Sequence, residues 1–311
     1  MTTQEFTGAR PVPTRLRAEG RRWGEDAVKV VLALCALVSV VTTVGIIIAL
    51  LEPSIEFFRE VPVTDFFSGE RWAPLFEPAS FGVRPLLTGT LVVTFWACVV
   101  ALPLGLGAAI FMSEYAKPRT RNIVKPALET LAGIPTVVFG FFALTFFTPF
   151  LQDLGTGVGV FNVLSAGLVV GVMLIPIVAS VSDDAMSAVP QELRDGAYGL
   201  GATRLQVSTK IVVPAAVSGI VASYVLAISR AIGETMIVLI AAGGLAQITF
   251  DPREQSQTMT AFIAATGTGD VPTGSIEYKT IFAVVLTLFV ITFAMNIFSI
   301  RLVRRFREIY E

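Results

Sequence analysis

The chain has 311 residues, of which 54% are hydrophobic and only 15% are charged. Soluble domains are about 45–50% apolar and about 25% charged, so this composition argues against an ordinary soluble enzyme. The 23 basic and 24 acidic residues nearly cancel, and histidine is absent. We therefore expect no nucleic-acid partner, no His-based catalytic residue and no histidine metal site.

Six segments of the chain are apolar and long enough, or nearly so, to cross a membrane, because about 20 apolar residues span about 30 Å of hydrocarbon. In chain order they are Val30–Leu51, Leu86–Met112, Leu131–Phe147, Phe161–Val181, Pro214–Ile240 and Thr280–Ile300. The third is the shortest, and we place its start earlier, near Ile123. None alternates with the period of two that a barrel strand requires. The sequence therefore predicts an all-α polytopic protein with six transmembrane helices in a lipid bilayer.

Lysine and arginine are distributed unequally between the connections. The tails 1–29 and 301–311 and the connections 113–130 and 182–213 carry 17 basic residues together, whereas 52–85, 148–160 and 241–279 carry five. The side with more basic residues faces the cytoplasm, so both termini are predicted to be cytoplasmic. The expected order is a cytoplasmic tail (1–29), an anchor helix (30–51), an extracytoplasmic loop (52–85), a helical core (86–300) with a cytoplasmic loop (182–213), and a cytoplasmic tail (301–311).

Two charges remain inside the predicted spans, Arg230 and Glu234, both in the fifth. Their spacing of four residues places them on one face of a helix. A charge at the bilayer centre costs from about 2.5 kcal/mol upward and usually faces a bundle interior or an aqueous path. One interpretation is a self-neutralising ion pair that fixes helix packing. The favoured one is an anion pathway, in which the planar fork of Arg230 binds the anion and Glu234 holds or releases the arginine side chain.

The chain lacks the motifs of an energy source. No G-x-x-x-x-G-K-[ST] sequence is present to hold a nucleotide, and neither a carboxylate cluster for Mg²⁺ nor a G-x-S-x-G nucleophile elbow occurs. We therefore expect no cofactor in this chain. Uphill transport would need an ion gradient or a separate subunit.

The cytoplasmic loop 182–213 predicts two short helices separated by a sharp turn. Leu193, Ala197 and Leu200 share one face of the first helix at i, i+4 and i+7. Gly201 supplies the left-handed backbone conformation that such a turn needs, and Thr203 caps the second helix. A small helix held at the membrane surface in this way could transmit a push from a docked partner.

The spacing in this loop is Asp195-Gly196-Ala197, three residues, Gly201, nine residues, Ile211, two residues and Pro214. It resembles the EAA loop of ABC-importer permeases, with Asp-Gly in place of Glu-Ala and Val213 in place of leucine. The resemblance implies the MetI-like type I importer permease fold. It also implies that Asp195 to Gly201 form a coupling helix, which docks into a groove on a cytoplasmic ATPase.

Four more segments carry a closer resemblance: Phe81–Thr90, Ala101–Tyr115, Ala132–Gly140 and Ile228–Met236. Together, over about residues 72–305, they resemble the phosphate ABC-importer permeases, and the PstC half of that pair more than the PstA half. The resemblance implies import of phosphate across the cell membrane by alternating access, past Arg230 and Glu234. The implied partners are a homologous permease subunit, an ATPase dimer that binds ATP and Mg²⁺, and an external phosphate-binding protein.

Two groups of alternatives remain open. The chain could be the PstA half, or a permease for another oxyanion such as molybdate or sulfate. From another class, it could be a secondary transporter or a channel that needs no ATPase. Co-purification distinguishes this last alternative from an ABC importer, because only an ABC importer requires an ATPase subunit in the transporting complex.

Overall fold

The computed structural model describes residues 23–306, and side chains within residues 25–302. Of the predicted tails, residues 1–22 and 307–311 therefore lie outside the described part. By internal packing the chain divides into two units, Met1–Ala49 and Leu50–Glu311. Helix α1 (Trp23–Glu60) runs through this boundary and contains the predicted anchor helix.

The described part of the chain holds five helical segments that are long and apolar enough to cross a membrane, and a sixth if one bent pair counts as a single span. The five are Glu25–Glu60, Arg84–Tyr115, Thr136–Asp153, Val163–Ser187 and Ile276–Leu302. The bent pair joins Arg204–Ala215 to Val217–Ile232 at an angle of 72°. The prediction of an all-α polytopic protein is confirmed, with the fifth predicted span as the bent one.

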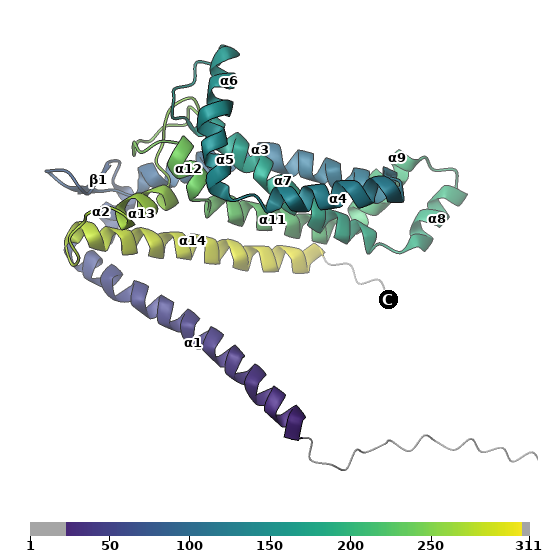
Figure 1. Ribbon diagram of the computed structural model, residues 1–311, viewed down its shortest axis with the longest axis horizontal. Coiled ribbons are helices and arrows are strands. Elements are labelled where there is room, and N and C mark those ends of the chain that lie inside the picture. The colour runs from purple at the N-terminus through teal and green to yellow at the C-terminus, as the bar shows by residue number, and fades with distance from the viewer. Residues whose placement is uncertain (1–22, 307–311) are drawn as a thin grey trace, which may run out of the picture. The chain divides into compact units, whose positions relative to one another are not determined.

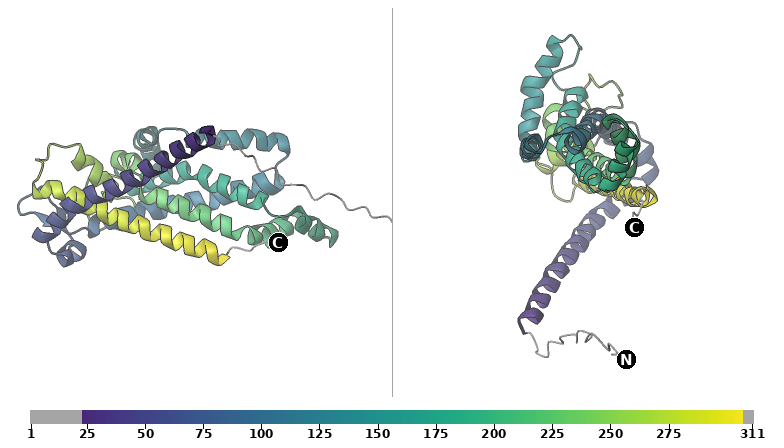
Figure 2. Two further views of the ribbon diagram at one scale, coloured as in Figure 1. Left: turned by 90° about the horizontal axis from the view of Figure 1, so that it is seen from below. Right: turned by 90° about the vertical axis from the view of Figure 1, so that its right-hand side faces the viewer.

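Four long helices of the second unit run alongside one another (Figures 1 and 2). They are α3 (Arg84–Ile110), α7 (Val163–Ser187), α11 (Val217–Ile232) and α14 (Ile276–Phe306). Helices α3 and α7 form the closest pair because Gly167 and Gly171 leave room for the neighbouring backbone. A Cβ atom at Gly167 would lie 2.8 Å from Cβ of Trp96, and one at Gly171 only 2.7 Å from the carbonyl oxygen of Ala97.

The third predicted span begins later than Leu131. An amphipathic helix, α4 (Pro118–Ala132), ends just before Gly133, and the apolar helix starts only after Pro135. Proline has no N–H to continue a helix, so Pro135 separates the two. The span itself consists of α5 (Thr136–Phe142), a π-helical turn η2 (Ala143–Phe147) and α6 (Thr148–Asp153).

The fifth predicted span, Pro214–Ile240, is not one continuous helix. The short α10 (Val213–Ala215) precedes the 72° bend into α11, which ends at Ile232. A second short helix, α12 (Met236–Ala241), starts after three residues outside a helix. The apolar composition of residues 214–240 predicts a single continuous helix, because composition does not reveal where the backbone leaves the helical conformation.

The connecting segments gather at the two ends of the second unit (Figure 1). At one end lie α2 (Val63–Ser68), an antiparallel hairpin of β1 (Trp72–Ala73) and β2 (Ser80–Phe81), and α13 (Met259–Gly267). Together with the last turns of α1, which contribute Phe57, these elements share an aromatic core that also contains Phe66, Trp72 and Phe262. At the opposite end lie α8 (Gln191–Gly199), α9 (Arg204–Val207) and the π-helical turn η3 (Ser208–Val212). The hairpin within the predicted loop 52–85 and the helices α8 and α9 within the predicted loop 182–213 thus lie at opposite ends of the bundle (Figure 1), whereas α4 runs alongside it and α6 projects away from it.

Candidate coupling and transport sites

The loop with the EAA-like spacing folds as the predicted helix, turn and helix. Gly201 has a φ of +83°, in the left-handed region that glycine adopts without strain. The next helix, α9, starts with a capping box: the backbone N–H of Gln206 donates to Oγ1 of Thr203 at 3.4 Å, and that of Thr203 donates to Oε1 of Gln206 at 2.8 Å. The turn between α8 and α9 is therefore set by its local sequence.

The structure brings together some of the predicted loop residues. Ala197 is buried, and Ile211 packs against the apolar cluster that contains Ala197, Val207 and Val212. This cluster attaches α8 to η3 and to the end of α7.

The other loop residues of the motif lie outside this cluster. Asp195 accepts a hydrogen bond from Nε2 of Gln191 at 3.0 Å on the exposed surface of α8. Gly196 has open space around it, as does Gly201, and Pro214 is exposed in α10. The predicted common face of Leu193, Ala197 and Leu200 is wrong, because Leu200 is 91% exposed just beyond the end of α8.

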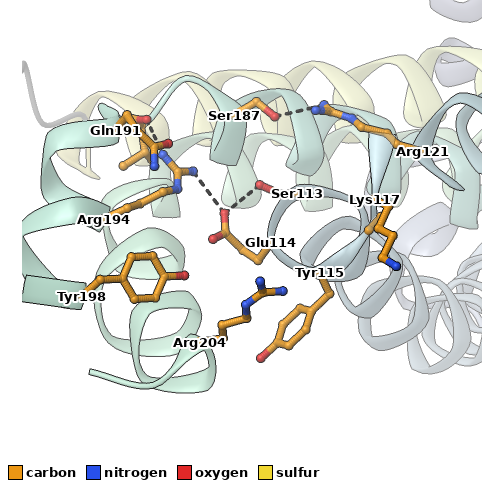
Figure 3. Close-up of a pocket in the computed structure, with 12 residues that line it drawn as sticks. Ser113, Glu114, Tyr115, Lys117, Arg121, Ser187, Gln191, Arg194, Tyr198 and Arg204 are labelled. Carbon is orange, nitrogen blue, oxygen red and sulfur yellow. Dashed lines mark hydrogen bonds and ion pairs between the residues drawn. The ribbon is translucent and has the colours of Figure 1, made fainter. Parts of the chain in front are cut away.

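Sequence reasoning missed a buried ion pair that attaches α8 to two other helices (Figure 3). Nη2 of Arg194 lies 3.1 Å from Oε1 of Glu114, which belongs to the π-helical turn η1 (Phe111–Tyr115) at the end of α3. Arg194 also donates from Nη1 to the carbonyl oxygen of Val189 at 2.6 Å and from Nη2 to that of Met186 at 2.8 Å. The sequence places both charges in connections 80 residues apart, so only the fold brings them together.

The ion pair borders a polar cavity of about 940 Å³ between η1, α4, α7, α8 and α9 (Figure 3). The side chains of Lys117 and Arg204 line it without a hydrogen bond or ion pair to any residue in the described ranges. Arg121 lines it as well and donates to the buried Oδ2 of Asp183 at 2.8 Å, which ties α4 to α7. The cavity therefore carries an excess of positive charge.

A second contact between α4 and α7 involves Lys125. Its Nζ donates to Oδ1 of Asp184 at 2.9 Å, and this hydrogen bond raises the pKa of Lys125 above its ordinary value. The ammonium group therefore stays charged throughout the physiological pH range. Its electrostatic attraction to Asp184 of α7 persists over the same range.

Arg230 and Glu234 do not share a helix face. Arg230 lies exposed in the last turn of α11, whereas Glu234 follows the end of that helix, because α11 stops at Gly233. Oε1 of Glu234 accepts hydrogen bonds from the backbone N–H groups of Met236 at 3.1 Å and Ile237 at 3.3 Å, at the start of α12.

Each of the two charges therefore sits at the helix end whose dipole favours it: the cation at a C-terminus and the anion at an N-terminus. Within the described part of the chain no ion pair or hydrogen bond joins them, and Arg230 has no partner of either kind. Glu234 is only 6% exposed, and its carbonyl oxygen accepts a hydrogen bond from Oγ1 of Thr260 at 2.5 Å, which fixes the break against α13. Arg230 and Glu234 therefore do not form the self-neutralising pair of the first interpretation, and the Arg230 guanidinium is available.

Comparison with known proteins gives consistent matches. Residues 101–308 match the family described as binding-protein-dependent transport system inner membrane component. The chain is 34% identical to the probable ABC transporter permease protein YqgH of Bacillus subtilis, over 88% of this chain and 89% of that protein. It is 31% identical to the phosphate transport system permease protein PstC of Haemophilus influenzae, over 92% and 95% of the two chains. It is 33% identical to PstC of Mesorhizobium japonicum, over 73% and 74%.

Solved structures agree on the fold. A chain of a bacterial alginate ABC transporter, crystallised with an alginate-bound periplasmic protein, superimposes with a TM-score of 0.63 at 16% identity, over 92% of this chain and 98% of that one. A chain of the MetNI methionine ABC transporter superimposes with a TM-score of 0.54 at 18% identity, over 73% and 95%. These likenesses confirm the predicted type I importer permease fold.

Proposed function

The chain belongs to the family of binding-protein-dependent transport system inner membrane components, and we propose that it is the permease subunit of an ATP-driven importer of inorganic phosphate. It is a transporter subunit rather than a catalytic enzyme. The observation that carries the proposal is the EAA-like loop, built as a short helix and a left-handed turn at one end of the bundle within the matched residues. The substrate is inferred from the PstC relatives, which are named as phosphate transport system permeases.

In this proposal α8 docks on a separate ATPase dimer. We assign the binding of ATP and Mg²⁺ to that dimer because this chain has no nucleotide-binding motif. The exposed Leu200 beyond the end of α8 is an apolar contact for the ATPase groove. Closure of the ATPase dimer moves α8, and the helices attached to it switch the pore between outward and inward access. A homologous permease subunit supplies the second half of the pore.

Arg230 is the proposed anion contact in the pore. Its guanidinium donates parallel hydrogen bonds that suit the oxygen atoms of phosphate, and it has no competing partner among the described residues. Glu234 is proposed here as a positioning residue and not, as the sequence predicts, as a direct partner of Arg230. By capping α12 it maintains the break that leaves Arg230 at the end of α11.

The sidedness follows from the charge distribution. The end of the bundle with α8 faces the cytoplasm, together with both termini, because its connections hold most of the basic residues. The opposite end, with the hairpin and α13, faces outward and receives the phosphate-binding protein.

The test is purification of the chain from native membranes in mild detergent, followed by reconstitution into liposomes. We expect an ATPase subunit and a second permease to co-purify, and the external binding protein loaded with phosphate to stimulate ATP hydrolysis and uptake. Stimulation by molybdate or sulfate in place of phosphate would assign another oxyanion. Transport by a complex that contains no ATPase would reject the ABC importer in favour of a secondary transporter or channel.

A further inference from the structure

Arg194 joins three elements through one side chain (Figure 3). It belongs to α8, it donates to the carbonyl oxygens of Met186 in the last turn of α7 and of Val189 in the connection to α8, and it forms an ion pair with Glu114 at the end of α3. The side chains of Arg194 and Glu114 are only 10% and 5% exposed. The contact is therefore internal, although it lies at the surface end of the bundle.

The chemistry of the contact depends on arginine. A buried charge pair is tolerated when its remaining hydrogen-bonding groups are satisfied, and the planar guanidinium reaches three acceptors in different directions. The carbonyl oxygen of Met186, in the last turn of α7, accepts the backbone N–H of Val189 at 3.2 Å, and Arg194 adds a second, charged donor to it. Oε1 of Glu114 accepts a second hydrogen bond from Oγ of Ser113 at 2.9 Å, which fixes the carboxylate.

The rest of α8 is attached elsewhere. Ala197 packs into the apolar cluster with Val207 and Val212, and the chain continues through α9 and η3 towards α11. The ion pair adds a lateral link from α8 to η1 and α3. A displacement of α8 thus has one route along the chain to α11 and a lateral route to α3, where the ion pair of Arg194 adds a charged link to the apolar packing around Ala109.

We propose that Glu114 and Arg194 are a positioning pair that transmits the movement of α8 to α3. The inference rests on the proposed function, because it assumes that an ATPase drives α8. With the pair intact, α3 follows α8 as a rigid body, and α7 follows through the same arginine. Without it, ATPase docking and ATP hydrolysis continue while α3 no longer follows, so hydrolysis is uncoupled from transport.

The decisive variant is the double substitution Glu114→Met with Arg194→Met in the complete transporter. It removes both charges, so that neither is left buried without a partner, and replaces them with apolar side chains of similar length. The measurement is phosphate uptake per ATP hydrolysed in liposomes, normalised to the amount of assembled complex. We expect normal assembly, retained hydrolysis and uptake per ATP reduced by about fivefold or more. A purely structural role would lower the amount of complex and leave this ratio unchanged.

Two further variants complete the test. Glu114→Gln keeps an acceptor for Arg194 without the charge, and we expect a smaller loss of coupling; it decides the question if the double variant does not assemble. Arg204→Gln is the matched control, because Arg204 lines the same cavity without a partner among the described residues. Wild-type uptake per ATP in both the double and the Gln variant would overturn the proposal. Absence of ATP-dependent phosphate uptake in the wild type would instead reject the proposed function.

Discussion

At the scale of single residues, the break between α11 and α12 explains how two charges are accommodated in an apolar segment. The sequence singles out Arg230 and Glu234, because they are the only charges within the predicted spans. It does not predict their geometry, because the spacing of four implies contact only if the helix continues. Gly233 ends α11, so the two charged side chains do not stabilise each other. Arg230 is stabilised by the C-terminal end of α11 and Glu234 by the N-terminal end of α12.

Arg230→Gln is expected to abolish phosphate uptake while the complex still assembles. The variant keeps a polar side chain of similar length at an exposed position, so the fold loses no hydrogen bond or ion pair among the described residues, but the anion loses its charged fork. Uptake of labelled phosphate into liposomes, compared at equal amounts of complex, measures the effect. Arg119→Gln, at an exposed position on α4, serves as the control. Unchanged uptake by the Arg230 variant would reject the anion pathway at this residue.

Glu234→Ala is expected to destabilise the protein by about 1 kcal/mol, because α12 loses the cap that accepts two of its backbone N–H groups. Glu234→Gln retains an acceptor oxygen and is expected to be closer to the wild type. Thermal unfolding of the purified complex in detergent gives the comparison. If the Ala and Gln variants unfold at the same temperature, capping is not the role of Glu234.

At the scale of elements, the sequence predicts the kind and order of the helices better than their breaks. The α8–α9 turn is predicted well, because Gly201 and the Thr203 cap act locally. The start of the third span is predicted too early, because residues on both sides of Pro135 are apolar and the break depends on one missing N–H group. The link between Glu114 and Arg194 is not predictable, because it depends on packing between distant segments.

Gly201→Val is expected to weaken attachment of the ATPase. A left-handed conformation costs a residue with a Cβ atom about 1–2 kcal/mol, and the strain falls on the turn at the end of α8. The fraction of ATPase retained with the chain on an affinity column measures the effect. Gly107→Ala is the matched control: its site within α3 is open and outside the coupling loop, and alanine favours a helix, so it should retain the ATPase normally. Equal retention in both variants would contradict a coupling role for this turn.

At the scale of the whole molecule, the near-zero net charge conceals a strong division between the connections. Their basic residues, counted along the sequence, assign the connections to alternate sides of the membrane, and the structure places the corresponding loops of the second unit at opposite ends. The loops 52–85 and 182–213, which the sequence assigns to opposite sides, lie at opposite ends of the bundle. Which of these ends faces the cytoplasm stays a prediction from the distribution of basic residues.

The orientation itself is open to a direct test with single cysteines. Leu200 at the α8 end is 91% exposed and Phe76 in the hairpin is 69% exposed, so a cysteine at either position is accessible to a reagent on its own side. In a chain whose two natural cysteines, Cys35 and Cys98, are replaced by alanine, we expect Phe76→Cys to react with a membrane-impermeant maleimide in intact cells. We expect Leu200→Cys to react only after the membrane is opened.

The cysteine-free chain controls for labelling of other groups, and uptake of phosphate by each variant controls for correct insertion. Because the ATPase is expected to cover the α8 end, labelling of Leu200→Cys after opening should be weaker in the complete transporter than in the chain expressed alone. Reaction of Leu200→Cys in intact cells, with Phe76→Cys protected, would invert the topology and place the ATPase-binding loop outside the cell. That result would reject both the cytoplasmic termini and the coupling of this loop to ATP hydrolysis.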